Sequence, residues 1–243
     1  MVTGASRGIG AAIALAAAGR DYRVALNYAT SAAETEAVAG RIRAAGGTAS
    51  AIEGDVADPS AVARLFERAE RELGPIVALV NNAGITGRHA RLEALEAADI
   101  ARVTAVNVVG TILCAREAVL RMSTKRGGAG GAIVNLSSRA AQIGGGGEWV
   151  HYAASKGAVE TFTLGLAREV AGEGIRVNAV APGLIDTELH ARAGEPGRLE
   201  RLTRTVPQQR AGTPQEVADA VLWLLSREAS YVTGAILAVS GGR

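Results

Sequence analysis

The segment YAASK holds two side chains whose types and spacing could move a proton, Tyr152 and Lys156. Lys156 is one of two lysines in the chain, whereas arginine supplies the rest of its 26 basic residues. Residues four positions apart share one face of a helix, so the phenol and the ammonium would project together. A free phenol has a pKa of about 10, which is too high for acid–base work at neutral pH.

A neighbouring ammonium could correct that pKa. A positive charge ~4 Å from the phenol would favour the phenolate by ~4 kcal/mol at an effective dielectric of ~20, which corresponds to about three pKa units. Lysine suits the position because its compact head has three rotating donors, which could also contact ribose hydroxyls and a water. The spacing therefore predicts that Lys156 lowers the pKa of Tyr152 and makes it a general acid–base. Packing of two helix neighbours is the alternative.

Ser138 ends the apolar run GAIVNLSS, which is typical of a buried strand. In an open parallel sheet, ligands bind outside the carboxyl ends of the strands, where this hydroxyl would lie. It could donate a hydrogen bond to a substrate carbonyl and stabilise charge that develops on the oxygen. Ordinary turn chemistry at a strand end is the alternative for serine.

The segment TGASRGIG places Gly4, Gly8 and Gly10 between a short first strand and an alanine-rich helix. Glycines allow the backbone to approach a pyrophosphate, and the helix N-terminus offers free N–H groups to it. The spacing differs from the common G-x-G-x-x-G pattern, and a plain tight turn is the alternative. The loop predicts a dinucleotide site.

The end of the second strand bears on the choice of cofactor. A carboxylate about 20 residues after the glycine loop would bind the ribose hydroxyls of NAD. The chain has LNYATS there, with Asn27 and no acid before Glu34, while Arg7 inside the loop could bind a 2′-phosphate. We expect NADP(H) to be preferred, with NAD(H) possible; Arg7 as a solvated turn residue is the alternative.

Short β-branched runs alternate with longer amphipathic stretches throughout the chain. Asp58-Pro59 and Thr213-Pro214 are typical of helix starts, and only three residues precede Gly4, so the first strand is about half the usual length. The pattern predicts an α/β fold, one doubly wound Rossmann-type parallel sheet of about seven strands over residues 1–243. The expected strands are 23–28, 48–53, 76–81, 132–137, 176–181 and 235–239, and the expected helices are 9–19, 31–45, 59–73, 96–122, 151–172 and 213–226.

A polar insertion follows Pro182-Gly183 and precedes the helix that starts at Thr213. Such a segment resembles a lid that closes over a substrate, and we place it at about 184–212. A solvated helical hairpin is the alternative. Glu148, Trp149 and His151 crowd against Tyr152, where packing within the loop is favoured over a role in the pocket.

Bulk properties exclude several classes of protein. Of 243 residues, 48% are hydrophobic and 21% are charged, and the net charge is +2, so the chain is neither disordered nor a nucleic-acid binder with a basic stripe. Cys114 is the single cysteine, which is compatible with a cytoplasmic location. His89 and His190 have no neighbouring ligand pattern, so no metal is expected. No continuous apolar run approaches the ~20 residues of a membrane span.

Several motifs occur in order across nearly the whole chain: residues 3–10, NNAG at 81–84, Asn107, Ser138, YAASK, and PG at 182–183. Together they resemble the short-chain dehydrogenase/reductase superfamily, and within it bacterial glucose 1-dehydrogenase-like oxidoreductases, with 3-oxoacyl-carrier-protein reductases as relatives. The segment between Ser138 and Tyr152 is one residue longer than is usual in that family. Ser240 stands where many relatives have an acid.

The resemblance implies roles for individual residues. Tyr152 would be the general acid–base, Ser138 would orient the carbonyl, Lys156 would hold the nicotinamide ribose, and Asn107 would hold a relay water at a local break in its helix. Asp55 would accept from the adenine amino group. The cofactor-binding residues that it implies are Gly4, Ser6, Arg7, Gly8, Ile9, Gly10, Asn27, Asp55, Val56, Asn82, Ala83, Gly84, Tyr152, Lys156, Pro182, Gly183, Ile185 and Thr187.

The function expected from the sequence is hydride transfer between NADP(H) and the carbon of a carbonyl or secondary alcohol, on a small-molecule substrate and without a metal. A 3-oxoacyl-thioester reductase and a non-catalytic NADP-sensing protein are the alternatives. The stretch 100–122 is apolar around much of its circumference, so the core or another subunit must cover it. The resemblance implies a homotetramer with this helix and the helix of Tyr152 at an interface.

Overall fold

The computed structural model describes residues 1–188 and 194–243, and its centre is a parallel sheet. Two strands pair at one side, β1 (Val24–Tyr28) with β2 (Ala49–Glu53). Four pair in sequence order at the other side: β3 (Ala78–Asn81), β4 (Gly131–Leu136), β5 (Ile175–Pro182) and β6 (Ile236–Val239). Each lies within two residues of the expected strand, and runs of buried, mostly aliphatic residues define β1, β3, β4 and β5.

The N-terminal segment joins the two groups of strands. Val2 forms parallel bridges with Leu26 on one side and Val80 on the other. Its N–H donates to the carbonyl oxygen of Ala25 at 2.9 Å, and the N–H of Thr3 donates to that of Val80 at 3.0 Å. The order is therefore β2-β1-Val2-β3-β4-β5-β6, seven positions with the first strand reduced to a bridge. The strand order reverses beside Val2, which places the following glycine loop at the switch point of the sheet.

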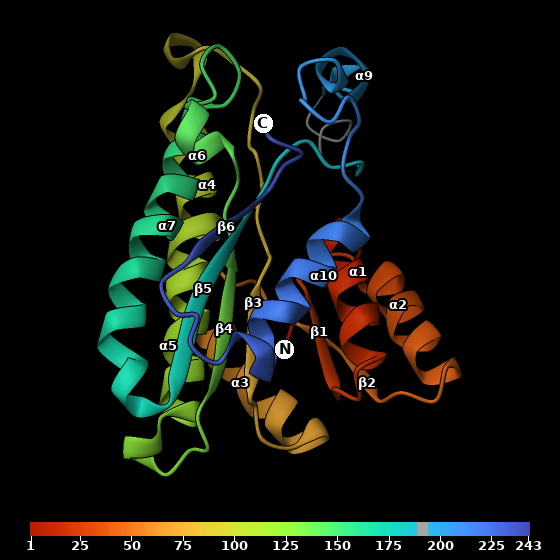
Figure 1. Cartoon of the computed structure of the whole chain (residues 1–243), viewed down its shortest axis with the longest axis vertical. Helices are drawn as coiled ribbons and strands as arrows, with labels where there is room; N and C mark the ends of the chain where they lie inside the picture. The colour runs from red at the N-terminus through yellow and green to blue at the C-terminus, as the bar shows by residue number, and fades with distance from the viewer. Residues whose placement is uncertain (189–193) are drawn as a thin grey trace.

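Helices cover both faces of the sheet (Figure 1). On one face lie α1 (Gly8–Ala18), α2 (Ala32–Ala44) and α10 (Pro214–Leu225), with the α1–α10 contact the most extensive. On the other lie α3 (Pro59–Leu73), α4 (Ala97–Thr104), α5 (Gly110–Met122) and α7 (Val150–Val170). Two short helices, α6 (Ala140–Ile143) and α9 (Arg198–Thr203), lie near one end of the sheet.

Two of the helix starts show why the sequence folds as it does. The Asp58 carboxylate accepts from the N–H of Ser60 at 2.8 Å, with Pro59 in the first helical position. Thr213 and Glu216 satisfy each other's backbone N–H groups in a capping box at the start of α10. These contacts satisfy donors that a helix N-terminus leaves without intrahelical partners.

The helix expected over 96–122 is interrupted. A π-helical turn, Ala105–Val109, separates α4 from α5 and holds Asn107. By length and composition alone the run Ala97–Met122 could span a membrane, with a mean hydropathy of 1.5 in its most apolar part. Its Val103, Cys114 and Met122 side chains are fully buried in this fold, which is typical of a core helix.

Candidate active site

A cavity of about 740 Å³ opens at the carboxyl ends of the strands, within the size range of cofactor and substrate sites. Because all the strands are parallel, the segments that follow β3, β4 and β5 meet there with the glycine loop. It also receives the N-terminal part of α7 and the helix α9. The predicted site residues that line it are Gly4, Ser6, Arg7, Gly8, Ile9, Gly10, Asn82, Ala83, Gly84, Ser138, Tyr152, Lys156, Pro182, Gly183, Ile185 and Thr187.

The glycine loop has room only for glycine at its closest approaches. A Cβ on Gly10 would lie 2.3 Å from the carbonyl oxygen of Gly4 and 2.5 Å from Nδ2 of Asn82, and Gly4 has φ +62°. Asn82 fastens the loop by donating from Nδ2 to the carbonyl oxygens of Thr3 and Gly4, each at 2.9 Å. The backbone of this loop therefore lies so close to the end of β3 that only glycine fits at these positions.

The start of α1 fits a phosphate. The N-cap residue, Arg7, makes no capping hydrogen bond, and Gly8, Ile9 and Gly10 of the first turn line the cavity. Gly8, at φ +54°, brings the backbone to the lining without a side chain in the way. A helix N-terminus of this kind binds anions. These residues fit the pyrophosphate of a dinucleotide.

The structure places Glu34 beside Arg7, a contact that the sequence did not indicate. Its Nη2 donates to the Ser31 hydroxyl at 3.1 Å and to the Glu34 carboxylate at 2.8 Å, and its Nε lies 3.9 Å from a carboxylate oxygen of Glu188. The guanidinium is 31% exposed and lies on the cavity lining. Binding of a 2′-phosphate by Arg7 stays a prediction, and the Glu34 carboxylate lies beside the guanidinium that would bind it.

Four predicted residues lie outside the cavity lining. Asn27 is buried and donates to the carbonyl oxygen of Gly54 at 2.8 Å, so it holds β1 to the segment after β2. Asp55 pairs with Arg102 at 3.2 Å and accepts from the N–H of Ala57 at 2.9 Å. Val56 is a core residue. Contact between these three and the adenosine part of a cofactor stays a prediction.

Asn107 is the fourth of these residues, and it holds the backbone of Ile85, which lines the cavity. Its Oδ1 accepts from the N–H of Ile85, and its Nδ2 donates to the carbonyl oxygen of Ile85, both at 2.9 Å. Nδ2 also donates to the Ser155 hydroxyl at 3.0 Å. The π-helical turn agrees with the expected break in the helix, whereas the relay water stays a prediction.

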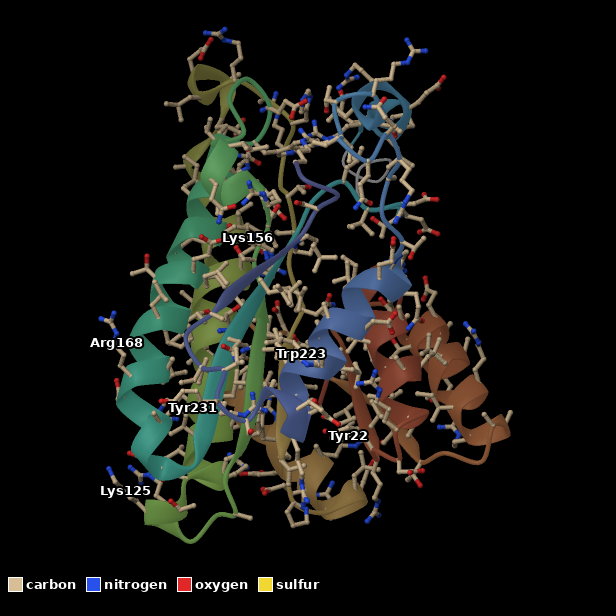
Figure 2. The ribbon with its side chains drawn as sticks, in the orientation of Figure 1. Tyr22, Lys125, Lys156, Arg168, Trp223 and Tyr231 are labelled. Atoms are coloured by element: carbon tan, nitrogen blue, oxygen red, sulfur yellow. The ribbon has the colours of Figure 1, made fainter. Side chains whose placement is uncertain are left out.

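Tyr152, Lys156 and Ser138 meet at one wall of the cavity. The Nζ of Lys156 lies 5.7 Å from the centroid of the Tyr152 ring, and the Ser138 hydroxyl forms a hydrogen bond with the phenol. The Lys156 side chain is buried and donates to the carbonyl oxygen of Leu136, the last residue of β4, at 2.6 Å. Figure 2 shows Lys156 within the molecule between α7 and the sheet, whereas Lys125 lies at the outer surface of the opposite end.

The expected shift in the pKa of Tyr152 has the opposite sign. Burial raises the pKa of this phenol, and the hydrogen bond from Ser138 and the positive charge of Arg198 oppose that rise only in part. Burial also lowers the pKa of Lys156 from 10.5 to about 8. The prediction overlooked desolvation, which acts on both groups and disfavours the charged form of each. At neutral pH the structure holds a neutral phenol beside a lysine that is still protonated.

The substrate end of the cavity holds residues that the sequence analysis missed. Arg198, on α9, stacks over the ring of Trp149 with its Cζ 4.9 Å from the ring centroid, and it forms an ion pair with Glu148. Arg139 and Arg243 also line this end. No sequence signal separates these arginines from the many others. Glu148 and Trp149 line the cavity too, and whether they do more than pack within the loop stays a prediction.

A glycine turn precedes α7, and its Gly144, Gly145 and Gly147 all have positive φ. That this turn accommodates the extra residue between Ser138 and Tyr152 stays a prediction, as does the lid. The predicted lid, 184–212, includes residues of the cavity lining and α9, but its residues 189–193, with His190, lie outside the described part of the chain. Within the described residues, no cluster of His, Cys, Asp or Glu could hold a metal ion.

Comparison with known proteins agrees with this geometry. Residues 4–243 match the family model described as enoyl-(acyl carrier protein) reductase. The chain is 50% identical over its whole length to YgfF, an uncharacterized oxidoreductase of Escherichia coli strain K12, of which it covers 98%. It is 39% identical to the 3-oxoacyl-acyl-carrier-protein reductase FabG of Staphylococcus aureus and 37% identical to glucose 1-dehydrogenase 2 of Bacillus subtilis, covering 96% and 93% of them.

Solved structures agree as well. A short-chain dehydrogenase from Burkholderia cenocepacia in complex with NADP superposes with a TM-score of 0.91 at 36% identity, over 99% of this chain and 95% of that one. The chain belongs to the short-chain dehydrogenase/reductase family and is an oxidoreductase of that family.

Proposed function

We propose that this protein is an NADP(H)-dependent reductase of a small carbonyl compound, with Tyr152 as the proton donor. The observation that supports it most is that one cavity is lined by the glycine loop, Arg7, Ser138, Tyr152 and Lys156. When bound, the cofactor supplies the hydride that a carbonyl carbon accepts.

The chain's own residues account for the proton. Ser138 and Tyr152 share a wall of the cavity, so both hydroxyls can donate hydrogen bonds to one carbonyl oxygen. As negative charge develops on that oxygen, the O–H bond of Tyr152 breaks and its proton forms the new hydroxyl. The phenolate that remains is stabilised by the Lys156 ammonium and takes a proton back from solvent.

The charge state of Tyr152 suits the role of proton donor in reduction. A proton donor must be neutral before it acts, and burial keeps the Tyr152 phenol neutral at neutral pH by raising its pKa. The protonated Lys156 acts after proton transfer, when the phenolate exists.

The cofactor choice rests on Arg7. We infer that the Arg7 guanidinium, which donates to Ser31 and Glu34, binds the 2′-phosphate of the cofactor. The structural relative from Burkholderia cenocepacia was solved with NADP. A 3-oxoacyl thioester is the second candidate substrate, favoured by the 39% identity to the staphylococcal reductase over 242 residues.

The test is a panel of aldehydes, ketones and 3-oxoacyl thioesters, with NADPH consumption followed by absorbance. We expect turnover of at least one class and a loss of about a thousandfold or more in Tyr152→Phe, which cannot donate the proton. Tyr231→Phe, at a fully exposed tyrosine, is the matched control. Equal activity of Tyr152→Phe and the native protein would refute the mechanism. Tight NADPH binding without turnover of any compound would instead indicate a cofactor sensor.

A further inference from the structure

The substrate end of the cavity carries an arginine that is buried and incompletely satisfied. Arg198 is 8% exposed, and its Nε has no hydrogen-bond partner among the residues that the structure describes. Its guanidinium stacks on Trp149, which fixes the plane of the group, and forms an ion pair with Glu148, which fixes one edge of it. A buried guanidinium donor without an acceptor has a large desolvation cost, which a ligand could offset.

Positive charge is in excess around Arg198. Three guanidinium groups line this end of the cavity, from Arg139, Arg198 and Arg243, and Glu148 is the carboxylate among them. Arg139 donates to the backbone oxygen of Arg243 at 2.6 Å and to Gln142, whereas the Arg243 guanidinium has no hydrogen bond or ion pair with any described residue. Glu148 pairs with Arg198 and the main-chain carboxyl oxygen of Arg243 accepts from Arg139, so the Arg243 guanidinium is the cation of this group without an anionic partner among the described residues.

The pKa of Arg243 reflects the same excess. Burial lowers it most, repulsion from Arg198 lowers it further, and Glu148 opposes the shift. By contrast, Arg7 at the other end of the cavity is near two carboxylates, those of Glu34 and Glu188. The uncompensated charge therefore belongs to the end where the substrate would lie, and not to the part of the cavity beside the glycine loop.

Arg198 lines the same cavity as the reacting group. Its positive charge lowers the pKa of the Tyr152 phenol, against the larger effect of burial. A substrate whose carbonyl oxygen contacts Tyr152 would therefore place its neighbouring substituents near the guanidinium. An arginine fork binds a carboxylate or a phosphate through two parallel hydrogen bonds, which fixes direction as well as distance.

We propose that the carbonyl substrate carries an anionic group, a carboxylate or a phosphate, a few bonds from the reacting carbon, and that Arg198 binds this group with help from Arg243. This inference rests on the proposed reductase function and narrows its substrate class. Trp149 and Glu148 position the guanidinium, while the free Nε edge and Arg243 face the ligand. A neutral ketone would leave these cations buried without a counter-charge.

Matched pairs of substrates test the inference, with acetoacetate against ethyl acetoacetate for a carboxylate and dihydroxyacetone phosphate against dihydroxyacetone for a phosphate. We expect the native enzyme to favour one anionic member by about tenfold or more in kcat/KM, as a charge-assisted contact would produce. Arg198→Met should reduce that preference at least tenfold, and Arg198→Lys should retain part of it. Arg204→Met, at an exposed arginine that follows α9, is the matched control and should retain the full preference.

Three results would overturn the inference. The native enzyme could reduce the neutral members as well as the anionic ones. Arg198→Met could lower both members of each pair equally, which would indicate a structural role. Finally, Arg198→Met could raise the KM for NADPH and leave the preference between members intact, which would assign the arginine to the cofactor.

A binding measurement separates failure of this inference from failure of the proposed function. In the Tyr152→Phe protein with NADPH, the anionic member of a pair should raise the melting temperature, and Arg198→Met should abolish that rise. A rise that depends on Arg198 in a protein that reduces no carbonyl would retain the anion site and reject the reductase. Turnover of neutral carbonyls without any such rise in melting temperature would retain the reductase and reject the anion site.

Discussion

The ammonium of Lys156 donates to the carbonyl oxygen of Leu136 at 2.6 Å while lying 5.7 Å from the centre of the Tyr152 ring. The helix α7 brings the two side chains to one face, and the end of β4 supplies the acceptor that holds the lysine. Lys156 is thus connected both to the sheet and to the phenol. Because it is 4% exposed, its charge is present in the fold at a cost.

Replacement of this lysine should separate stability from activity. The unfolded chain keeps Lys156 protonated up to its ordinary pKa of 10.5, whereas the folded chain releases the proton near pH 8. Below pH 8 the buried charge therefore costs about 3 kcal/mol, and this cost disappears as the pH rises from 8 to 10.5. After discount for the lost hydrogen bond to Leu136, we expect Lys156→Met to raise the free energy of unfolding at pH 7 by about 1–3 kcal/mol.

Urea unfolding at pH 7 and pH 9.5 measures this effect, and carbonyl reduction should fall by at least about a hundredfold in the same variant. The gain in stability should be smaller at the higher pH. Lys125→Met, at the exposed lysine, is the control and should change neither quantity. A Lys156→Met protein that is less stable than the native one at pH 7 would show that the ammonium contributes net stability.

The same lysine predicts a pH profile for the reaction. If protonated Lys156 stabilises the phenolate left after proton transfer, kcat/KM for carbonyl reduction should be level near pH 7 and should fall above about pH 8. Steady-state rates from pH 6 to pH 10 with excess NADPH measure the profile. In Lys156→Arg the charge persists, since the arginine pKa lies above ~12, so the fall should vanish even where the rate is lower. If kcat/KM still falls above about pH 8 in Lys156→Arg, the fall reports the titration of another group.

Much of the fold could be predicted from the sequence, because the signals that define it are local. Short apolar, often β-branched runs indicated the six strands, and Asp58 and Thr213 indicated helix starts that the capping contacts confirm. The glycine loop was recognised from its spacing. Lys156 and Tyr152 share a face because residues four apart do so in any helix.

The parts that were missed depend on contacts between distant segments. Glu34 pairs with Arg7 across 27 residues, and Arg198 reaches Trp149 only after the chain has crossed the cavity mouth. The pKa of Tyr152 was predicted with the wrong sign because burial, which dominates it, is a property of the packed structure. Spacing along a chain shows which groups can meet, and the burial of those groups determines their charge.

The pair between Arg7 and Glu34 predicts the response of cofactor choice to mutation. Arg7→Ala removes the donors available to a 2′-phosphate, so the Kd for NADPH should rise about tenfold or more while that for NADH changes little. Glu34→Gln removes a negative charge beside the same phosphate and should improve NADPH binding several-fold. Fluorescence titration with both cofactors measures each effect. Equal losses for NADPH and NADH in Arg7→Ala would show that this residue serves the fold instead.

Asn107 should matter for stability as well as rate. Its amide satisfies both backbone groups of Ile85 and the Ser155 hydroxyl, and the side chain is buried. Asn107→Ala would leave both backbone groups of Ile85 without this partner, while the Ser155 hydroxyl would still donate to the carbonyl oxygen of Tyr152, and we expect a loss of about 2–4 kcal/mol in the free energy of unfolding. The rate should fall too, because Gly84 beside it lies between Asn107 and Lys156. Gln215→Ala, at an exposed amide on α10, is the control for urea unfolding. A comparable loss in that variant would show that the loss is not specific to the buried contacts of Asn107.

The apolar residues left exposed on two adjacent helices support a prediction about assembly. Val109 and Ile112, at the π-helical turn and on α5, and Leu164 on α7 are each about 40% exposed, at 42%, 40% and 41%. We propose that a second copy of the chain covers them in a homotetramer, because large aliphatic side chains on neighbouring helices gain by removal from water.

Light scattering at micromolar concentration should show the assembly, and Ile112→Asp or Leu164→Asp should reduce its mass. Leu92→Asp, at an apolar residue with 64% exposure outside these helices, should leave the mass unchanged. A native protein that scatters as a monomer would contradict the prediction, and a loss of assembly in Leu92→Asp would place the interface elsewhere.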